Sequence, residues 1–325
     1  MKQFLIIQTA FLGDVILATP LIEEYHRIYP TASIDVLVRK GNEGILKDHP
    51  LIRTVFTLDK KQKKTHELAR LIKHFKTVKY DEIINLHRYL SSGLITLFSG
   101  AKSTVGFDKN PVSFFYSRKI KHSLNEGLHE VERNLKCIAH HGATKKVAPK
   151  IYPSNSDFTK IEPLSKESYY CIAPASVWFT KQLPTEKWIE LIGLLPSNNS
   201  IYLLGGPADT QLCEDIRQQS SNPNVTNLAG TLSYLESAAL MKNAQRNFVN
   251  DSGPLHISSS MDAKVTAFFC STTPNFGFGP LSNDAIVVES IEELPCKPCG
   301  IHGYKTCQKG HFKCGNSIQF NQIGL

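Results

Sequence analysis

Short apolar runs that are typical of β-strands alternate with helical stretches along both halves of the chain. This alternation predicts parallel sheets built from strand–helix–strand units, and therefore an α/β fold class. The expected strands lie near residues 4–9, 33–38, 54–58, 82–86 and 104–106 of the first half, and near 169–173, 201–204, 225–228, 247–250 and 265–269 of the second. The expected helices lie near 15–29, 65–75, 185–195 and 232–242. Two Rossmann-like, doubly wound domains that face each other across a cleft are the simplest architecture for this pattern.

A polar, proline-containing stretch from residue 145 to residue 163 separates the two halves. We therefore expect an N-terminal domain over residues 1–155 and a C-terminal domain over residues 156–325. A length of 325 residues suits two domains of ordinary size, each with its own core. A hydrophobic content of 41% and a charged content of 20% exclude disordered and fibrous proteins.

The start of the chain, Met1-Lys2 followed by an apolar run, loosely imitates a signal peptide. Gln8, Gly13 and Asp14 interrupt that run, and an amphipathic helical pattern follows it. No apolar run reaches the roughly 20 residues that a membrane-spanning helix needs. We therefore interpret this segment as the first strand of a cytoplasmic protein.

Basic residues outnumber acidic residues in the chain, which has a formal net charge of +8 and a sequence pI of about 9.0. The excess gathers in two stretches of the first half, one with Lys60, Lys61, Lys63, Lys64, Lys73, Lys76 and Lys79, the other with Arg118, Lys119, Lys121 and His122. Such blocks are either solvated faces or surfaces that attract an anionic partner. No nucleic-acid-binding motif accompanies them, so nucleic acid is not an expected partner. The anionic partners that remain are a phosphorylated substrate and the anionic surface of the inner membrane, with which we expect peripheral contact.

Asp14 is the first candidate for a catalytic residue. It follows the expected first strand and Gly13, which lets the chain turn tightly and lets a substrate approach the backbone closely. Because open α/β sheets bind ligands at the carboxyl ends of their strands, Asp14 is expected at the mouth of a binding cleft, as a catalytic base. An aspartate at the start of a helix also suits an N-cap, and this segment alone leaves both interpretations open.

Two loops of the second half have the features of anion sites. The loop after residue 173 contains Ser176, Thr180 and Lys181, and a lysine offers a phosphate a compact charge with three donors. The turn Asp251-Ser252-Gly253-Pro254-Leu255-His256 begins a helix, whose N-terminal N–H groups and dipole attract anions. A solvated lysine and an ordinary capped helix are the alternatives. Both loops nevertheless follow expected strands, as do Asp14 and the polar loop 271–280, and this shared edge favours a site for a sugar diphosphate.

The segments Gln8–Pro20 and Asn250–His256 carry a resemblance that extends over nearly the whole chain. They resemble glycosyltransferase family nine, the bacterial lipopolysaccharide heptosyltransferases, and the first segment looks closest to the heptosyltransferase II branch. The resemblance implies the two-domain GT-B fold, with the acceptor bound by the N-terminal domain and the nucleotide sugar by the C-terminal domain. Leu183 is a departure, because the family commonly has tryptophan at that position.

The reaction that this resemblance implies is transfer of a heptose from ADP-heptose to the inner core of lipopolysaccharide, with inversion at the anomeric carbon. Asp14 is implied as the general base that acts on the acceptor hydroxyl. The implied donor-binding residues are Ser176, Thr180, Lys181, Asp251, Ser252, Gly253 and His256. His87 and Arg88 follow a first-half strand and are either acceptor-binding residues or a solvated pair. No metal is required, because the positive groups at the diphosphate can stabilise the departing ADP.

Eight cysteines divide into two groups. Four stand singly within expected elements, where buried and inert thiols are usual: Cys137, Cys171, Cys213 and Cys270. The other four cluster near the C-terminus, in a Cys-x-x-Cys pair followed by two further residues: Cys296, Cys299, Cys307 and Cys314. This second pattern suggests a structural zinc site, and leaves free thiols and disulfides as alternatives.

Two other classes of function fit the same pattern. One is a GT-B-like enzyme that uses another nucleotide sugar, as a transferase or as an epimerase. Release of ADP only when an acceptor is present would separate transfer from epimerisation. The other is a non-catalytic sugar-nucleotide-binding protein, against which the presence of Asp14 and Lys181 argues. A nicotinamide-linked oxidoreductase is disfavoured, because no Gly-x-Gly-x-x-Gly fingerprint follows the first strand.

Overall fold

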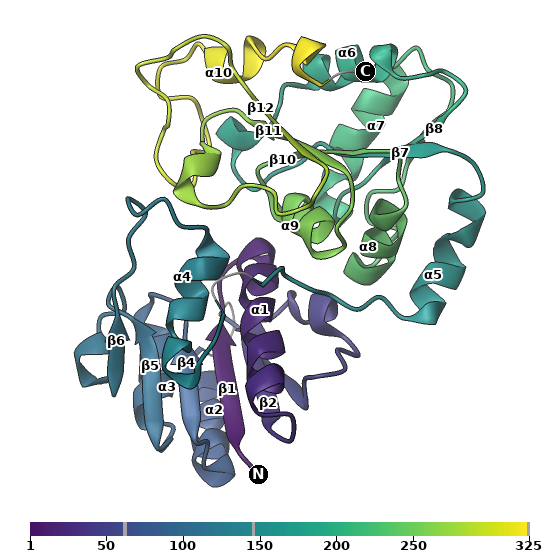
Figure 1. Cartoon of the computed structure of the whole chain (residues 1–325). Coiled ribbons are helices and arrows are strands. Elements are labelled where there is room, and N and C mark those ends of the chain that lie inside the picture. Colours follow the sequence, from purple (N-terminus) through teal and green to yellow (C-terminus); the bar gives the residue numbers. More distant parts are fainter. Residues whose placement is uncertain (61–63, 145–146, 324–325) are drawn as a thin grey trace. The chain divides into compact units, whose positions relative to one another are not determined.

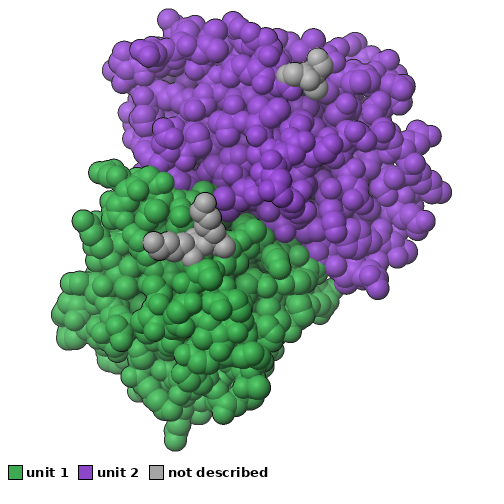
Figure 2. Space-filling view, in the orientation of Figure 1, with its two compact units in different colours: residues 1–152 green, residues 153–325 purple. Residues whose placement is uncertain are grey.

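The computed structural model describes residues 1–60, 64–144 and 147–323 (Figure 1). The chain divides into two compact units, Met1–Tyr152 and Pro153–Leu325, which Figure 2 shows in different colours. We call them unit 1 and unit 2. This boundary lies three residues before the one expected from the sequence, near the middle of the proline-containing stretch 145–163.

Unit 1 is built on a six-stranded sheet in which every pair of neighbouring strands is parallel. The strands are β1 (Gln3–Gln8), β2 (Ser33–Arg39), β3 (Thr54–Leu58), β4 (Glu82–Asn85), β5 (Ser103–Phe107) and β6 (Arg118–Ile120). Their order across the sheet is β3-β2-β1-β4-β5-β6. This is the doubly wound order of nucleotide-binding folds, whose switch point lies between the two central strands, here β1 and β4.

Helices pack on this sheet in two pairs, α1 (Leu12–Ile28) with α4 (Glu130–Lys136) and α2 (Lys64–Val78) with α3 (Leu90–Phe98) (Figure 1). Strands buried on both faces read as continuous apolar runs, and Leu5, Ile6 and Ile7 of β1 are fully buried. The sheet therefore forms the centre of the unit 1 core and holds the ends of β1 and β4 in fixed positions.

Unit 2 repeats the same plan. Its strands are β7 (Tyr169–Ala173), β8 (Ser200–Leu203), β9 (Val225–Asn227), β10 (Asn247–Asn250), β11 (Val265–Phe269) and β12 (Ala285–Glu289). They are parallel and follow the order β12-β11-β10-β7-β8-β9, so the switch point lies between β7 and β10. The helices are α5 (Asn155–Ile161), α6 (Thr185–Leu194), α7 (Thr210–Gln219), α8 (Tyr234–Lys242), α9 (Gly253–Ser260) and α10 (Lys313–Asn316).

Several residues near the C-terminus belong to the unit 2 core. Phe312, Cys314, Ile318, Phe320 and Ile323 pack into the same apolar cluster as Trp188 and Phe268. The Phe268 ring packs edge-on against the rings of both Trp188 and Phe320, which are the geometries that aromatic pairs prefer. The cysteine-rich segment before α10 is thereby anchored at its C-terminal end.

The structure confirms the α/β class and the two doubly wound units, and it adds elements that the sequence pattern did not predict. Strands β6 and β12 lie at sheet edges, and β6 has three residues within the basic stretch 118–122. Helix α5 lies inside the stretch that we interpreted as a linker. No helix of the described residues is long and apolar enough to cross a membrane.

Candidate functional site

The candidate residues of unit 1 lie where the chain leaves β1 and β4, at the carboxyl edge of the sheet. Connections from these two neighbouring strands run in opposite directions, which leaves a crevice where such folds bind ligands. Thr9 to Asp14 follow β1, and His87 and Arg88 follow β4. The sheet therefore brings together the two segments that the sequence analysis selected in this half.

Asp14 lies in the first turn of α1 and is half-buried. Its Oδ2 accepts a hydrogen bond of 3.1 Å from the backbone N–H of Phe11, the N-cap residue of that helix. The competing interpretation of Asp14 is thus partly right, because the carboxylate does cap the helix, although from the third helical position. Capping fixes the carboxylate at the carboxyl edge of the sheet, and this contact does not exclude the role of base.

His87 is buried, with its Nδ1 3.0 Å from the hydroxyl oxygen of Thr9. Burial, reinforced by the charges of Lys60 and Arg88, lowers the pKa of His87 to about 3. The imidazole is therefore neutral at physiological pH, so it can form hydrogen bonds but carries no positive charge. The neighbouring positive charge comes instead from Lys60, whose ammonium donates a 2.6 Å hydrogen bond to the carbonyl oxygen of Thr9.

The roles of Thr9 and Lys60 were missed from the sequence. Lys60 counted only as one member of a basic block, and its contact with Thr9 joins residues 51 positions apart. The position of Thr9 directly after the first strand was the one feature of the sequence that could have selected it as a site residue. Of the same block, Lys61 and Lys63 lie outside the described residues.

The loop that carries His87 and Arg88 is held by two asparagines. Asn85 accepts a hydrogen bond from the His87 backbone N–H, at 2.9 Å. Asn110 donates through its Nδ2 to the carbonyl oxygens of His87 and Tyr89, at 2.8 and 3.1 Å. Arg88 itself is exposed. The structure thus separates the pair that the sequence treated together, into one buried neutral ring and one exposed cation.

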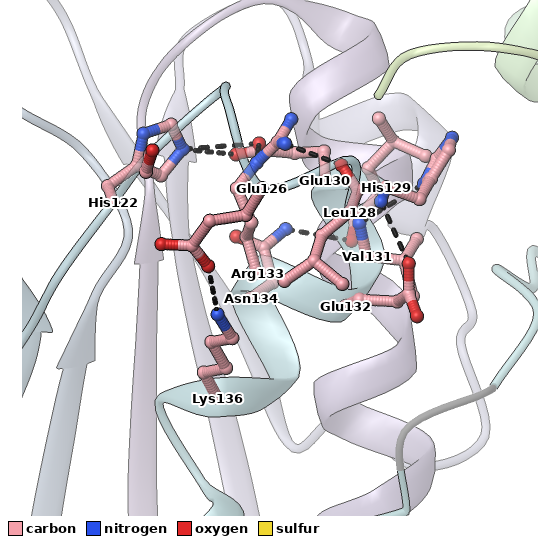
Figure 3. Close-up of polar contacts among 12 residues, drawn as sticks. His122, Glu126, Leu128, His129, Glu130, Val131, Glu132, Arg133, Asn134 and Lys136 are labelled. Atoms are coloured by element: carbon pink, nitrogen blue, oxygen red, sulfur yellow. Dashed lines mark hydrogen bonds and ion pairs between the residues drawn. The ribbon is translucent and has the colours of Figure 1, made fainter. Parts of the chain in front are cut away.

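A buried polar network in α4 supports α1, the helix that carries Asp14 (Figure 3). The Arg133 guanidinium contacts the Glu130 carboxylate at 2.6 Å, and Asn134 Nδ2 donates to the carbonyl oxygen of Leu17 in α1 at 3.0 Å. Although burial raises the pKa of Glu130, its contacts with His122 and Arg133 lower it overall. His122 therefore belongs to this internal network rather than to a solvated basic face.

In unit 2, Lys181 and Asp251 meet across the switch point. The Lys181 ammonium lies 2.6 Å from Asp251 Oδ2, and both side chains are largely buried. Lys181 follows β7 and Asp251 follows β10, so the pair joins the two loops that the sequence analysis selected. The hydroxyl of Thr272, after β11, donates to the same carboxylate oxygen at 2.6 Å.

Thr180 is buried, and its hydroxyl oxygen accepts hydrogen bonds from the Ser271 hydroxyl at 3.0 Å and from the Tyr304 backbone N–H at 2.8 Å. The Thr180 N–H in turn donates to the Tyr304 carbonyl at 3.1 Å. These contacts fix the backbone beside Lys181. Thr180 therefore holds the loop in place, while Ser176, which is half-buried, lies at its start.

The turn at Asp251 leads directly into α9. Ser252 is the N-cap with extended backbone, Gly253 is the first helical residue, and Pro254 is accepted there because the first turn needs no donor. Asn250 fixes this turn to the other loop, since its Nδ2 donates to the Pro174 carbonyl at 2.7 Å and its Oδ1 accepts from the Leu183 N–H at 2.9 Å. His256 lies one turn into α9 and is buried.

Unit 2 thus presents a lysine, a hydroxyl-bearing loop and a helix N-terminus at one sheet edge, which suits a diphosphate. Unit 1 presents a carboxylate, a neutral imidazole and basic groups at the corresponding edge, which suits an anionic molecule with a hydroxyl to deprotonate.

Metal-ligating groups are present in both units. Within the part of the chain that the structure describes, one group of three or more His, Cys, Asp or Glu side chains has its ligand atoms within 4.8 Å of one another: Glu82, His140 and His141. Both histidines contact the buried Glu82 carboxylate, at 3.1 and 2.8 Å, at the amino end of β4 and so at the opposite edge from His87. The four C-terminal cysteines do not form such a group and have free thiols.

The comparisons with known proteins agree with this geometry. A family model described as glycosyltransferase family 9 (heptosyltransferase) matches residues 68–306. Lipopolysaccharide heptosyltransferase 3 of Escherichia coli is 28% identical over 291 residues, which cover 85% of each chain. The resemblance inferred from the motifs is confirmed.

Two solved structures share the fold. The E. coli ADP-heptose lps heptosyltransferase II superposes with a TM-score of 0.78 at 20% identity and covers 94% of this chain and 92% of its own. The E. coli heptosyltransferase WaaC with ADP superposes with a TM-score of 0.74 at 23% identity, over 88% and 92% of the two chains. The expected GT-B class of fold is confirmed by these similarities.

Proposed function

Because this chain belongs to glycosyltransferase family 9 and is therefore a glycosyltransferase, we propose that it transfers a heptose from ADP-heptose to the core of lipopolysaccharide. The observation that carries the proposal is the Lys181–Asp251 pair at the switch point of unit 2, beside the N-terminus of α9. Relatives and structural neighbours supply the substrate class, since their names include lipopolysaccharide heptosyltransferase 3 and WaaC with ADP.

On the donor side, Lys181 and the N–H groups at Ser252 and Gly253 bind the diphosphate of ADP-heptose. Negative charge grows on the phosphate oxygen as its bond to the anomeric carbon breaks, so these groups stabilise the transition state more than the bound donor. Lys181 is paired with Asp251, which positions the ammonium before the donor arrives. Thr180 acts indirectly, by fixing the backbone of that loop through Tyr304.

On the acceptor side, Asp14 removes the proton of the attacking hydroxyl while its oxygen forms the new bond to the anomeric carbon. Attack on the face opposite the diphosphate inverts that carbon, and ADP leaves with the electron pair of the broken bond. General-base catalysis of this kind contributes roughly 10²- to 10⁴-fold in rate. Arg88 and Lys60 bind anionic groups of the acceptor, and His87 contributes a neutral hydrogen-bonding surface.

Which core sugar accepts the heptose is the finer part of the proposal. The motifs favoured the inner core, whereas the E. coli relative described above is named heptosyltransferase 3. A panel of lipopolysaccharides truncated at successive inner-core and outer-core sugars separates these acceptors. Addition of one heptose mass to a single member of the panel identifies it.

The decisive experiment incubates the purified protein with ADP-heptose, with and without that panel, and measures ADP release and acceptor mass. ADP release that requires an acceptor supports the proposal, and Asp14→Asn serves as the inactive control. Conversion of ADP-heptose to an isomer without acceptor would instead identify an epimerase. Turnover only with another nucleotide sugar would identify a different transferase, and donor binding without turnover would identify a binding protein.

We also propose a structural zinc at Cys296, Cys299, Cys307 and Cys314. Burial, and after it the charges of Cys299, Cys307 and Cys296, raise the pKa of Cys314 to about 11, while the nearby Lys297 ammonium opposes that rise. Hydrogen bonds from backbone N–H groups of residues 309–312 outweigh burial and lower the pKa of Cys307, which favours the thiolate that zinc requires. A bound zinc would draw these sulfurs together and fix the segment that carries Tyr304.

Elemental analysis of the purified protein tests the zinc proposal. One zinc per chain is expected, and it should be lost in a Cys307→Ser/Cys314→Ser variant. The buried Cys213→Ser variant is the matched control, because Cys213 is also a free thiol of the unit 2 core but belongs to α7 and not to the C-terminal segment. Metal-free protein with normal stability would overturn the proposal.

A further inference from the structure

Two adjacent phenylalanines of unit 1 are unusually exposed. Phe114 and Phe115, in the short helical turn after β5, are 67% and 59% exposed. Their ring centroids lie 4.0 Å apart, so they present one continuous apolar surface. Exposed apolar patches on a folded unit mark sites of contact with another surface.

The segment around these rings, residues 109–121, is basic and contains no acidic residue. Its charged side chains are Lys109, Arg118, Lys119 and Lys121, and all four are exposed. The preceding acid, Asp108, is half-buried and its carboxylate accepts a hydrogen bond from the His122 backbone N–H at 3.0 Å. The segment therefore offers positive charge and aromatic rings together. The exposed Glu126 carboxylate interacts with Lys121 but is paired with Lys136, at 2.6 Å.

This segment packs directly against the loop that carries the candidate acceptor residues. Asn110 donates to the carbonyl oxygens of His87 and Tyr89, and the Val112 N–H donates to Asn110 Oδ1 at 3.1 Å. Gly93 of α3 lies so close to Asn110 and Val112 that a side chain there would clash with both. The two segments are thus one continuous part of the surface.

The acceptor loop contributes exposed apolar and basic groups of its own. Tyr89 and Leu90 are 58% and 49% exposed, and Arg88 beside them is exposed as well. We call residues 88–90 and 109–121 the docking face. It combines aromatic and aliphatic side chains with at least as many cations, which is the composition of protein surfaces that lie in the headgroup region of a bilayer.

We propose that the docking face binds unit 1 to an anionic lipid bilayer, with the Phe114 and Phe115 rings inserted among the headgroups. The cations are attracted by anionic lipids, and each one near the surface adds to binding. The headgroup region accepts an apolar ring beside a cation, as Phe114 and Phe115 stand beside the exposed Arg118 and Lys119 in the chain. The purpose of docking rests on the proposed function, because a lipid-anchored acceptor would then enter next to His87 and Arg88.

The binding test uses the full chain and sedimentation with vesicles of phosphatidylcholine alone or mixed with phosphatidylglycerol. Wild type should bind the anionic vesicles, and added salt should weaken that binding. Phe114→Ser/Phe115→Ser and Arg118→Gln/Lys119→Gln/Lys121→Gln should each reduce it at least about tenfold. The matched controls are exposed residues of unit 2: Leu194→Ser/Ile291→Ser for apolar surface and Lys166→Gln/Lys264→Gln/Lys309→Gln for charge.

Both controls should bind as wild type does, since all of these exposed substitutions are expected to leave stability nearly unchanged. Absence of wild-type binding to anionic vesicles would overturn the proposal. So would equal losses in the unit 2 controls, because binding would then follow net charge or general apolarity rather than the docking face.

A second measurement separates docking from catalysis. Heptose transfer is compared on lipopolysaccharide embedded in vesicles and on the same core oligosaccharide freed of lipid. The docking variants should lose transfer to the embedded acceptor and keep transfer to the soluble one. If neither acceptor is used but the vesicle binding still depends on the docking face, the proposed function fails and the docking inference stands.

Discussion

The ammonium of Lys181 lies 2.6 Å from Asp251 Oδ2 and joins the loops after β7 and β10, the two central strands of unit 2. Neither residue could occupy this place alone, because a largely buried charge without a partner carries a high desolvation cost. The pair holds a cation at the sheet edge where the diphosphate of a nucleotide sugar is proposed to bind. Its two contributions, to stability and to ligand binding, can be separated by substitution.

Lys181→Ala should weaken ADP binding roughly tenfold or more and should lower the free energy of unfolding by about 3 kcal/mol, because Asp251 loses its cation. Lys181→Met combined with Asp251→Asn should recover much of the stability, since no buried charge remains, but should not recover ADP affinity. Calorimetry with ADP and urea unfolding measure the two effects. Lys187→Ala, which breaks the partly exposed pair with Glu190, is the control and should change neither by much. Full ADP affinity in the double variant would contradict the role of Lys181.

Asp14→Asn should reduce turnover at least about a hundredfold and leave ADP-heptose affinity nearly unchanged, because the base acts on the acceptor. The asparagine oxygen can still accept the Phe11 N–H, so the start of α1 should remain intact. Steady-state kinetics and donor titration measure the two effects. Asp157→Asn is a closely matched control, since Asp157 also accepts the backbone N–H of its N-cap, Ser154, from the third position of a helix. Comparable losses of turnover in both variants would show that capping, and not proton transfer, explains the Asp14 result.

The sequence predicted the central strands that position both sites, but not the contacts between the side chains of each site. Strands β3, β7, β10 and β11 begin and end at the expected residues, because apolar side chains occupy the middle of each. Edge strand β6 escaped prediction because it has only three residues and two of them, Arg118 and Lys119, are exposed and basic, which leaves no apolar pattern. The same basic residues looked like one block with His122, yet that ring turns inward to the Glu130 carboxylate. Sequence spacing could not show which members of a charged block face the interior.

Contacts between residues far apart in the sequence could not be predicted either. Thr180 was selected as a donor-binding residue, and its hydroxyl is held by the Tyr304 N–H from 124 residues away. The interaction depends on where the C-terminal segment returns to unit 2, which no local pattern encodes. Whether Ser176, Ser252 and His256 touch the donor remains a prediction that ADP-binding measurements on single variants can test.

Gly303→Ala tests whether the C-terminal segment shapes the Lys181 loop. Gly303 has φ +72, and an added Cβ would lie 2.9 Å from both Lys181 Cγ and Thr180 Oγ1. The segment or the loop must therefore shift, and ADP affinity should fall several-fold. Gly127→Ala is the control, because Gly127 has φ +64 with nothing within 4 Å of the added carbon. It should show the cost of left-handed backbone, about 1 kcal/mol, without loss of ADP affinity. An unchanged affinity in Gly303→Ala would mean that the segment does not constrain the donor loop.

His87 should make the stability of the protein sensitive to acid. Its pKa is lowered to about 3, first by burial and then by the charges of Lys60 and Arg88, whereas an unfolded histidine titrates near 6.5. Below pH 6.5 the unfolded chain therefore takes up a proton that the folded chain refuses. The free energy of unfolding should decrease as pH falls from about 6.5 toward 3, by up to about 1.4 kcal/mol per pH unit from this group.

His87→Asn removes this titration and keeps a polar atom near the position of Nδ1, within reach of the Thr9 hydroxyl. Urea unfolding of wild type and variant at pH 7, 6, 5 and 4 should show a shallower decline for the variant, whatever its stability at pH 7. Some decline should persist, because burial also lowers the pKa of His49, to about 4. The exposed His66→Asn is the control and should follow wild type. Parallel declines for wild type and His87→Asn would show that His87 is not held neutral in the folded unit, and the acceptor loop would then carry an additional positive charge.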